Sequence, residues 1–242
     1  GVCRLGGQEA ASARPILAAC VDHLLDHQRS HPRGGACWLR PGRTDGLIGY
    51  MQGTSGIAQA LAQAAPDHRA DELLAAAQAA LTYERAVAAD RGGHPDLRDK
   101  DGAPLRGFAN GAAGAGLARI AMQPWGIDLR HDELAWLAEI TGADLFAPTD
   151  DLFAGNFGRL LFLQRAAAVL SDADLADQAA AALVQRLSAA ERAGSFAWRA
   201  GGDGDNPGLF NGAAGVGLTL LHLAAPDRVP DFATLPVDLS SF

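Results

Sequence analysis

The sequence offers few side chains that could act on a substrate or hold a metal ion, since its 242 residues include only 7 histidines and 3 cysteines. His23, His27 and His31 recur at four-residue intervals, a spacing that could chelate a metal on a helix. The alternative interpretation is that these three histidines lie on the solvent-exposed face of an outer helix and bind no metal. Cys37, beside Trp38, is either a reactive thiol or a small buried side chain.

Residues 94–98 read His-Pro-Asp-Leu-Arg and bring three useful side chains into one loop. A histidine near a carboxylate can act as a general acid or base, so His94 is the candidate catalytic residue. Asp96 and Arg98 are candidate substrate-binding residues. Alternatively, Asp96 and Arg98 form an ion pair that only fixes the loop.

A further set of polar side chains lies in a repeated glycine motif. The motif has the form G-Φ-x-x-G-x-x-G, where Φ is hydrophobic, and an apolar run follows it. It occurs four times, and the third copy lacks the first glycine: residues 49–56, 107–114, 151–158 and 208–215. Gln52, Asn110 and Asn211 stand just before the second glycine in three copies. These amides are candidates to hold a peptide backbone, or else they cap the following helices.

The elements that must position these residues are helices. Leucine, alanine and valine recur at i, i+3, i+4 and i+7 in residues 10–28, 69–89 and 172–192, which predicts helices with one buried face. Strand signals are nearly absent, so we predict an all-α chain. Each repeat pairs an outer amphipathic helix with a nearly all-apolar inner helix that begins at a glycine turn.

A ring of such hairpins is an α/α toroid, and its glycine turns gather at one end of the central cavity. The three amides and residues 94–98 would then face a shared cleft. Four hairpins are too few to close the ring, and an open edge exposes an apolar flank. We therefore expect only the later part of the ring here. The missing hairpins would lie upstream in a longer polypeptide, or on a partner subunit that completes the toroid.

Composition narrows the possible partners and the compartment. The 20 Lys+Arg residues against 28 Asp+Glu residues give a formal net charge of −8, which argues against nucleic-acid binding. No apolar run approaches about 18 residues, so no membrane span is predicted. The first residues lack the organisation of a signal peptide, and three cysteines without a disulfide framework indicate a reducing compartment. We expect a cytoplasmic protein that binds neither nucleic acid nor membrane.

The glycine turns resemble those of the lanthionine synthetase C-like cyclases. Further stretches are similar to the cyclase region of class II (bifunctional) lanthipeptide synthetases: residues 36–38, 81–85, 94–98 and 208–230. The resemblance runs in collinear order from Ala13 to Pro236 and matches the later part of that region. It implies one domain over residues 1–242, with an outer helix and lead-in over 1–35 and glycine-turn repeats over 36–242.

Members of this family close thioether rings in ribosomally made peptides. The resemblance implies a zinc ion, typically held by two cysteines and one histidine, that presents a peptide thiolate to dehydroalanine or dehydrobutyrine. The matching positions here carry no metal ligand: Ala109, Phe153 and Ala154. Gln52 and Asn110 replace two further histidines of the family. We therefore expect that the zinc site is lost and that no cofactor is bound.

Three functions stay open, and with them the question whether the chain is an enzyme. The first is a zinc-free cyclase-like domain that binds or presents a modified precursor peptide, or supports an upstream dehydratase portion. The second is a zinc-independent Michael-type cyclase that adds a peptide cysteine thiol to dehydroalanine or dehydrobutyrine. Holding the two groups close would supply much of its rate, with His94 as acid or base. The third is an α/α-toroid peptide- or protein-binding module unrelated to cyclisation.

Overall fold

The computed structural model describes residues 7–67, 69–98, 103–143, 145–198, 206–226 and 228–229. Within these ranges the chain is mostly helical, which confirms the predicted all-α class. The elements in chain order are α1 (Gly7–His27), β1 (Gln28–Ser30), β2 (Ala36–Trp38), α2 (Thr54–Ala64), η2 (Ala65–Asp67), α3 (Ala70–Arg91), α4 (Ala112–Met122), η3 (Gln123–Trp125), α5 (His131–Gly142), α6 (Asn156–Leu170), α7 (Ala173–Ala193) and α8 (Ala213–Ala224).

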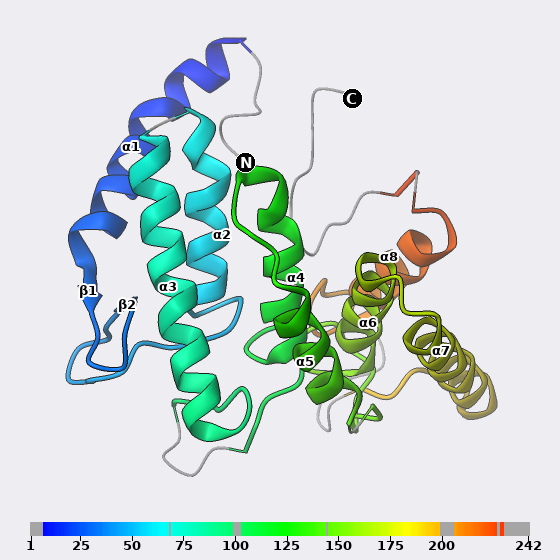
Figure 1. Ribbon diagram of the computed structural model, residues 1–242. Helices are drawn as coiled ribbons and strands as arrows, with labels where there is room; N and C mark the ends of the chain where they lie inside the picture. The colour runs from blue at the N-terminus through cyan, green and yellow to red at the C-terminus, as the bar shows by residue number, and fades with distance from the viewer. Residues whose placement is uncertain are drawn as a thin grey trace.

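The helices form an arc of hairpins (Figure 1). The four helices that follow the glycine turns form an inner row, in which α2 contacts α4, α4 contacts α6 and α6 contacts α8. In the outer row, α3 packs against α2, α5 packs against both α4 and α6, and α7 packs against α6. Outer and inner helices therefore alternate along the chain, as the glycine repeats predict.

The long outer helices α1, α3 and α7 begin and end within three residues of the predicted limits. α7 begins after Asp172, whose side chain accepts a hydrogen bond from the backbone N–H of Leu175 and caps the helix. α3 and α7 end at Gly92 and Gly194, with φ of 64° and 75°. Glycine adopts this left-handed conformation without a Cβ clash, so α3 and α7 stop where the sequence supplies one.

A short antiparallel hairpin, β1–β2, departs from the purely helical expectation. Its register pairs Gln28 with Trp38 and Ser30 with Ala36. The indole N–H of Trp38 donates to the carbonyl oxygen of Leu24 at 2.8 Å, which ties the hairpin to α1. Strands of three residues are too short to show an alternating pattern, so the sequence carries no readable signal for them.

Small residues allow the inner helices to approach one another closely. The buried face of α4 consists mainly of alanine and glycine. Gly116 of α4 packs against the ring of Phe162 on α6, and a Cβ at this position would collide with that ring. The main apolar clusters lie between the inner and outer rows of helices. The inner helices that follow the glycine turns are therefore held by a packed core.

Candidate functional site

The four glycine turns share one local construction. The second glycine of each motif is the extended N-cap of the following inner helix: Gly53, Gly111, Gly155 and Gly212. The third glycine packs against the carbonyl oxygen of the Φ residue in its own turn, where a Cβ would collide: Gly56 on Tyr50, Gly114 on Phe108, Gly158 on Leu152 and Gly215 on Leu209. The spacing of the motif thus produces a turn that has no room for a side chain at the third glycine.

Backbone hydrogen bonds join the tips of successive turns, always through the third residue of the motif. The N–H of Met51 donates to the carbonyl oxygen of Ala109 at 2.7 Å, and the N–H of Ala109 donates to that of Phe153 at 2.8 Å. The N–H of Phe153 in turn donates to the carbonyl oxygen of Phe210 at 2.9 Å. We call this row of bonds the tip ladder. It brings segments far apart in sequence to one end of the arc.

A cleft of about 460 Å³ lies at these tips, beside the first inner helix. Its aromatic part is contributed by three turns: the rings of Tyr50 and Phe108 are 4.9 Å apart, and those of Phe108 and Phe210 are 6.3 Å apart. Met51 and Gln52 also line it. No histidine, cysteine or acidic side chain lines the cleft in the described part of the chain. The surface is therefore suited to apolar groups with a hydrogen-bonding partner at one side.

The structure brings four of the five predicted binding residues together near the rim. Arg98 pairs with Asp96 through Nε and Oδ1 at 2.7 Å, and this contact lowers the pKa of Asp96. Nη1 of Arg98 donates to Oε1 of Gln52 at 3.2 Å. When the Asn110 amide is oriented to satisfy both of its polar atoms, its oxygen also accepts from this Nη1, at 3.3 Å. Arg98 therefore links the first two turns, and the Asp96–Arg98 pair does fix the loop. Asn211 is exposed and lies outside this group.

The amides do not cap the inner helices. The N-cap residue is the glycine that follows each amide, and the N-caps of α2, α4 and α8 have no side-chain hydrogen bond. The side chains of Gln52 and Asn110 are instead turned towards Arg98. They remain available at the rim as donors or acceptors.

His94 does not lie at the cleft, which contradicts the expectation that the loop before the second turn would carry it there. Its side chain is only 1% exposed, and Nε2 lies 3.1 Å from Oε1 of Glu84. It lines none of the cleft surface. His94 lines the second cavity described below and not the cleft, so it is not placed to exchange a proton with a peptide bound at the turn tips. A catalytic role for His94 elsewhere stays a prediction.

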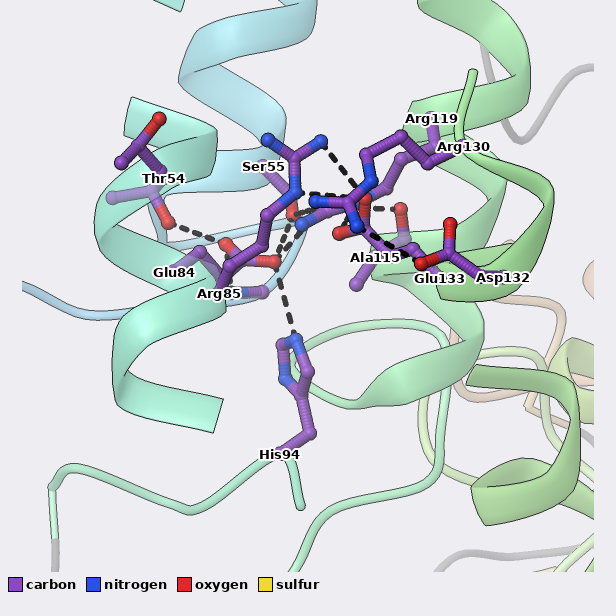
Figure 2. A network of polar contacts seen from close by, with 12 residues as sticks. Thr54, Ser55, Glu84, Arg85, His94, Ala115, Arg119, Arg130, Asp132 and Glu133 are labelled. Carbon is purple, nitrogen blue, oxygen red and sulfur yellow. Dashed lines mark hydrogen bonds and ion pairs between the residues drawn. The ribbon is translucent and has the colours of Figure 1, made fainter. Parts of the chain in front are cut away.

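Glu84 is the centre of a buried polar network (Figure 2). Its carboxylate accepts hydrogen bonds from one backbone N–H and four side chains: Gly49, Thr54, Ser55, His94 and Arg119. Burial alone would raise the pKa of Glu84. The attraction of Arg119 and the hydrogen bonds from His94 and Ser55 outweigh burial and hold this pKa well below its ordinary value.

The network extends from Glu84 on α3 to α4 and α5. Nη1 of Arg119 lies 2.9 Å from Oε1 of Glu84, and Nε of Arg119 donates to Oε1 of Glu133 at 3.0 Å. Nε of Arg85 donates to the other oxygen of Glu133 at 2.8 Å. Two arginines thus balance two glutamates. Because Glu84 also binds Gly49, the network positions the first glycine turn against three helices.

A second cavity, of about 410 Å³, lies beside this network and shares no lining residue with the cleft. Arg85, Arg130 and Trp136 are among its walls. Arg130 lies 2.9 Å from Asp132, and Arg85 pairs with Glu133, so its accessible charges are already paired. The Arg85–Glu133 pair joins α3 to α5 at this cavity, and Glu84, His94 and Arg119 of the buried network also line it.

The residues present do not fit the zinc site that the sequence resemblance implies. Ala109, Phe153 and Ala154 stand at the tips of the second and third turns, and none has a side chain that binds zinc. Across the described ranges, no three histidine, cysteine or acidic side chains are grouped so as to hold a metal ion. Carboxamide and phenyl groups at a turn tip are poor partners for zinc, which prefers thiolate and imidazole.

The histidines and the cysteine singled out near the start of the sequence serve structural contacts. His23 and His27 stack on α1 with ring centroids 4.1 Å apart. His31 lies beyond the helix, and its Nε2 is 3.1 Å from Asp45, so the three imidazoles do not converge. Cys37 is fully buried, and burial raises the pKa of its thiol. The small buried side chain is therefore the better interpretation of Cys37.

Sequence reasoning missed Glu84 and Arg119, the two residues that organise the first turn. A signal for Arg119 exists, since it is the one charged residue in the apolar run 112–122. A lone charge on an inner helix predicts a buried partner. Nothing comparable marks Glu84, because outer helices carry many glutamates and aspartates.

Comparison with known proteins gives one result. The model of the family described as "Lanthionine synthetase C-like protein" matches residues 16–234 of the chain. No curated protein sequence matches, and no solved structure matches. Among the described helices, none combines the length and the apolar character needed to cross a membrane.

Proposed function

The chain belongs to the lanthionine synthetase C-like family, and from this membership we propose that it is a zinc-free, cyclase-like domain that binds a modified precursor peptide in lanthipeptide-type biosynthesis. The peptide would occupy the cleft at the glycine-turn tips. We place this activity in the cytoplasm, where an upstream dehydratase portion or subunit would supply the dehydrated peptide. Family membership argues against the third function considered above, a binding module unrelated to peptide cyclisation.

One observation carries this proposal: the cleft combines an aromatic surface with a polar rim that the loop 94–98 holds in place. Tyr50 and Phe210 offer contacts for apolar peptide side chains and rest on the buried ring of Phe108. Gln52 at the cleft, and Arg98 beside it, offer an amide and a guanidinium to backbone carbonyl and N–H groups. A volume near 460 Å³ is in the range of small-ligand sites and can hold a few side chains of a peptide.

Binding is favoured over catalysis because the cleft lacks the groups that thioether formation would use. The zinc-independent cyclase relied on His94, which is buried against Glu84. The cleft lining includes no histidine, cysteine or acidic side chain in the described part of the chain. A peptide held here would be presented rather than deprotonated.

The test is a binding measurement with a short synthetic peptide that carries one dehydroalanine, one cysteine and one phenylalanine. Phe210→Ala removes an aromatic wall of the cleft and should weaken binding at least about tenfold. Phe146→Ala is the matched control, since Phe146 is exposed and lines no part of the cleft. Equal loss of affinity in both variants, or in neither, would refute binding at the turn tips.

A second readout from the same samples separates presentation from catalysis. Alkylation of free thiols followed by mass spectrometry measures how fast the bound peptide closes its ring. We expect the rate found in buffer alone. A clear acceleration that Phe210→Ala abolishes would establish the metal-independent cyclase in place of the binding domain.

A further inference from the structure

Arg98 holds the two amides at the rim of the cleft in one orientation. Its Nη1 donates to Oε1 of Gln52 at 3.2 Å, and the oxygen of the Asn110 amide accepts from the same Nη1 at 3.3 Å. A guanidinium has N–H donors and no acceptor, so each amide must turn its oxygen towards Arg98 and its NH2 group away. In the described part of the chain, the NH2 group of Gln52 has no hydrogen-bond partner. The NH2 group of Asn110 donates to the carbonyl oxygen of Ala109 at 3.1 Å, which leaves its second hydrogen for a ligand.

Arg98 is itself fixed before any ligand binds. Asp96 accepts from Nε of Arg98 at 2.7 Å and from Nη2 at 2.8 Å, and the backbone N–H of Arg98 donates to Oδ1 of the same carboxylate at 3.0 Å. Nη2 of Arg43 donates to the carbonyl oxygens of Leu97 and Arg98, at 3.1 and 3.2 Å, which holds the backbone of the loop. The guanidinium therefore meets the amides from a set direction, and most of the acceptor capacity of Asp96 is already used.

The polar side chains of the rim therefore face a ligand mainly with donors. Gln52 lines the cleft, and no acidic side chain does so within the described ranges. A peptide carbonyl oxygen placed at this rim gains a hydrogen bond from an amide NH2 group. A peptide N–H placed there meets another donor, and both groups lose their bound water without gaining a partner, which is unfavourable. The rim can thus distinguish the carbonyl groups of a peptide backbone from its N–H groups.

We propose that Arg98 is a positioning residue that sets the amides of Gln52 and Asn110 as hydrogen-bond donors, so that the cleft selects peptide segments by their free backbone carbonyl oxygens. This inference rests on the peptide-binding function proposed above and names the peptide group that the rim recognises. The preferred ligand is a segment in an extended or turn conformation, in which carbonyl oxygens point outwards. A helical segment uses the same oxygens for its own hydrogen bonds and is rejected.

Gln52→Glu tests the donor role, because it replaces the NH2 group with an acceptor oxygen and keeps the shape of the side chain. Binding of the dehydroalanine, cysteine and phenylalanine peptide should weaken about tenfold or more. Gln178→Glu is the matched control, since Gln178 is exposed on α7 and lines no part of the cleft. It makes the same change of charge and should leave affinity unchanged. Unchanged or tighter binding by Gln52→Glu would overturn the proposal.

Thioamide analogues of the peptide test the role of Arg98. A thioamide sulfur accepts hydrogen bonds more weakly than a carbonyl oxygen, and the substitution is made in turn at each carbonyl within two residues of the phenylalanine. For at least one position, the wild-type chain should bind the analogue about three- to tenfold more weakly than the parent peptide. Arg98→Met frees the amides to rotate, so this ratio should fall towards one. Arg98→Lys keeps a side chain that only donates and should restore much of it. A purely structural role would weaken binding of both peptides equally and leave the ratio unchanged.

The outcomes separate this inference from the function on which it rests. If Phe210→Ala weakens binding while Gln52→Glu does not, the peptide still binds at the turn tips and only the donor role is refuted. A ratio near one at every thioamide position in the wild-type chain refutes selection by carbonyl oxygens. If Phe210→Ala and Phe146→Ala behave alike, the peptide-binding function fails, and this inference fails with it. Far-UV circular dichroism checks that each variant is folded.

Discussion

Replacing Glu84 with glutamine should destabilise the fold far more than its small change in shape suggests. The carboxylate accepts five hydrogen bonds in a fully buried position and faces Arg119, which is itself only 3% exposed. Glutamine keeps one acceptor oxygen, but it adds donor hydrogens among donors and removes the charge that balances Arg119. Removing one partner of a buried ion pair costs about 3–5 kcal/mol, which is a large part of the stability of a typical domain.

Urea unfolding followed by circular dichroism and tryptophan fluorescence measures this loss. Asp22→Asn is the matched control, because it removes a carboxylate charge from an exposed ion pair with Arg69 and should change the unfolding free energy little. A double-mutant cycle with Arg119→Met should show strong coupling, since the two residues are in direct contact. If the unfolding free energy of Glu84→Gln lies within about 1 kcal/mol of that of the wild-type chain, the network does not hold the first turn in place.

Three further outcomes follow from contacts described above. The depressed pKa of Glu84 means that, as the pH falls through 4.5, the unfolded chain takes up a proton that the folded chain does not. The free energy of unfolding should therefore fall between about pH 5 and pH 3, and less steeply in Glu84→Gln. Gly116→Ala should lower thermal stability by about 1–3 kcal/mol because its Cβ collides with Phe162. Gly142→Ala, at an open position near the end of α5, should be neutral or slightly stabilising, and equal effects in both would contradict the packing argument. Metal analysis should find about one zinc ion per chain in a folded triple variant and none in the wild type, and failure to bind would count against the matched positions: A109C, F153C and A154H.

The scaffold could be predicted because its signals are local. Each inner helix follows a glycine turn, and each long outer helix coincides with an apolar stripe; the stripes of α3 and α7 end at Gly92 and Gly194. The sequence could also predict that Gln52, Asn110, Asp96 and Arg98 lie together, because equivalent positions of a repeat meet at one end of an arc.

The position of His94 could not be predicted, because it depends on a side chain elsewhere in the fold. The loop does run towards the second turn, but Glu84 offers a buried carboxylate that draws the imidazole inwards. No local pattern shows that Glu84 is buried, since the eventual partners Ser55 and Arg119 lie 29 and 35 residues away. Long-range pairing of charges is a property of the packed structure, which is why the expected place of His94 at the cleft was wrong while four of the predicted rim residues came together.

In the tip ladder, the bonds that hold successive repeats together do not depend on which side chains stand at the turn tips. Successive repeats are joined there by N–H and carbonyl groups, which every residue except proline supplies in full. Methionine, alanine and phenylalanine occupy equivalent tip positions without breaking a bond between turns. The side chain at a tip can therefore be exchanged with little cost to the scaffold. A chain built on such joints can therefore change the residues at its turn tips one at a time while the bonds between successive turns persist.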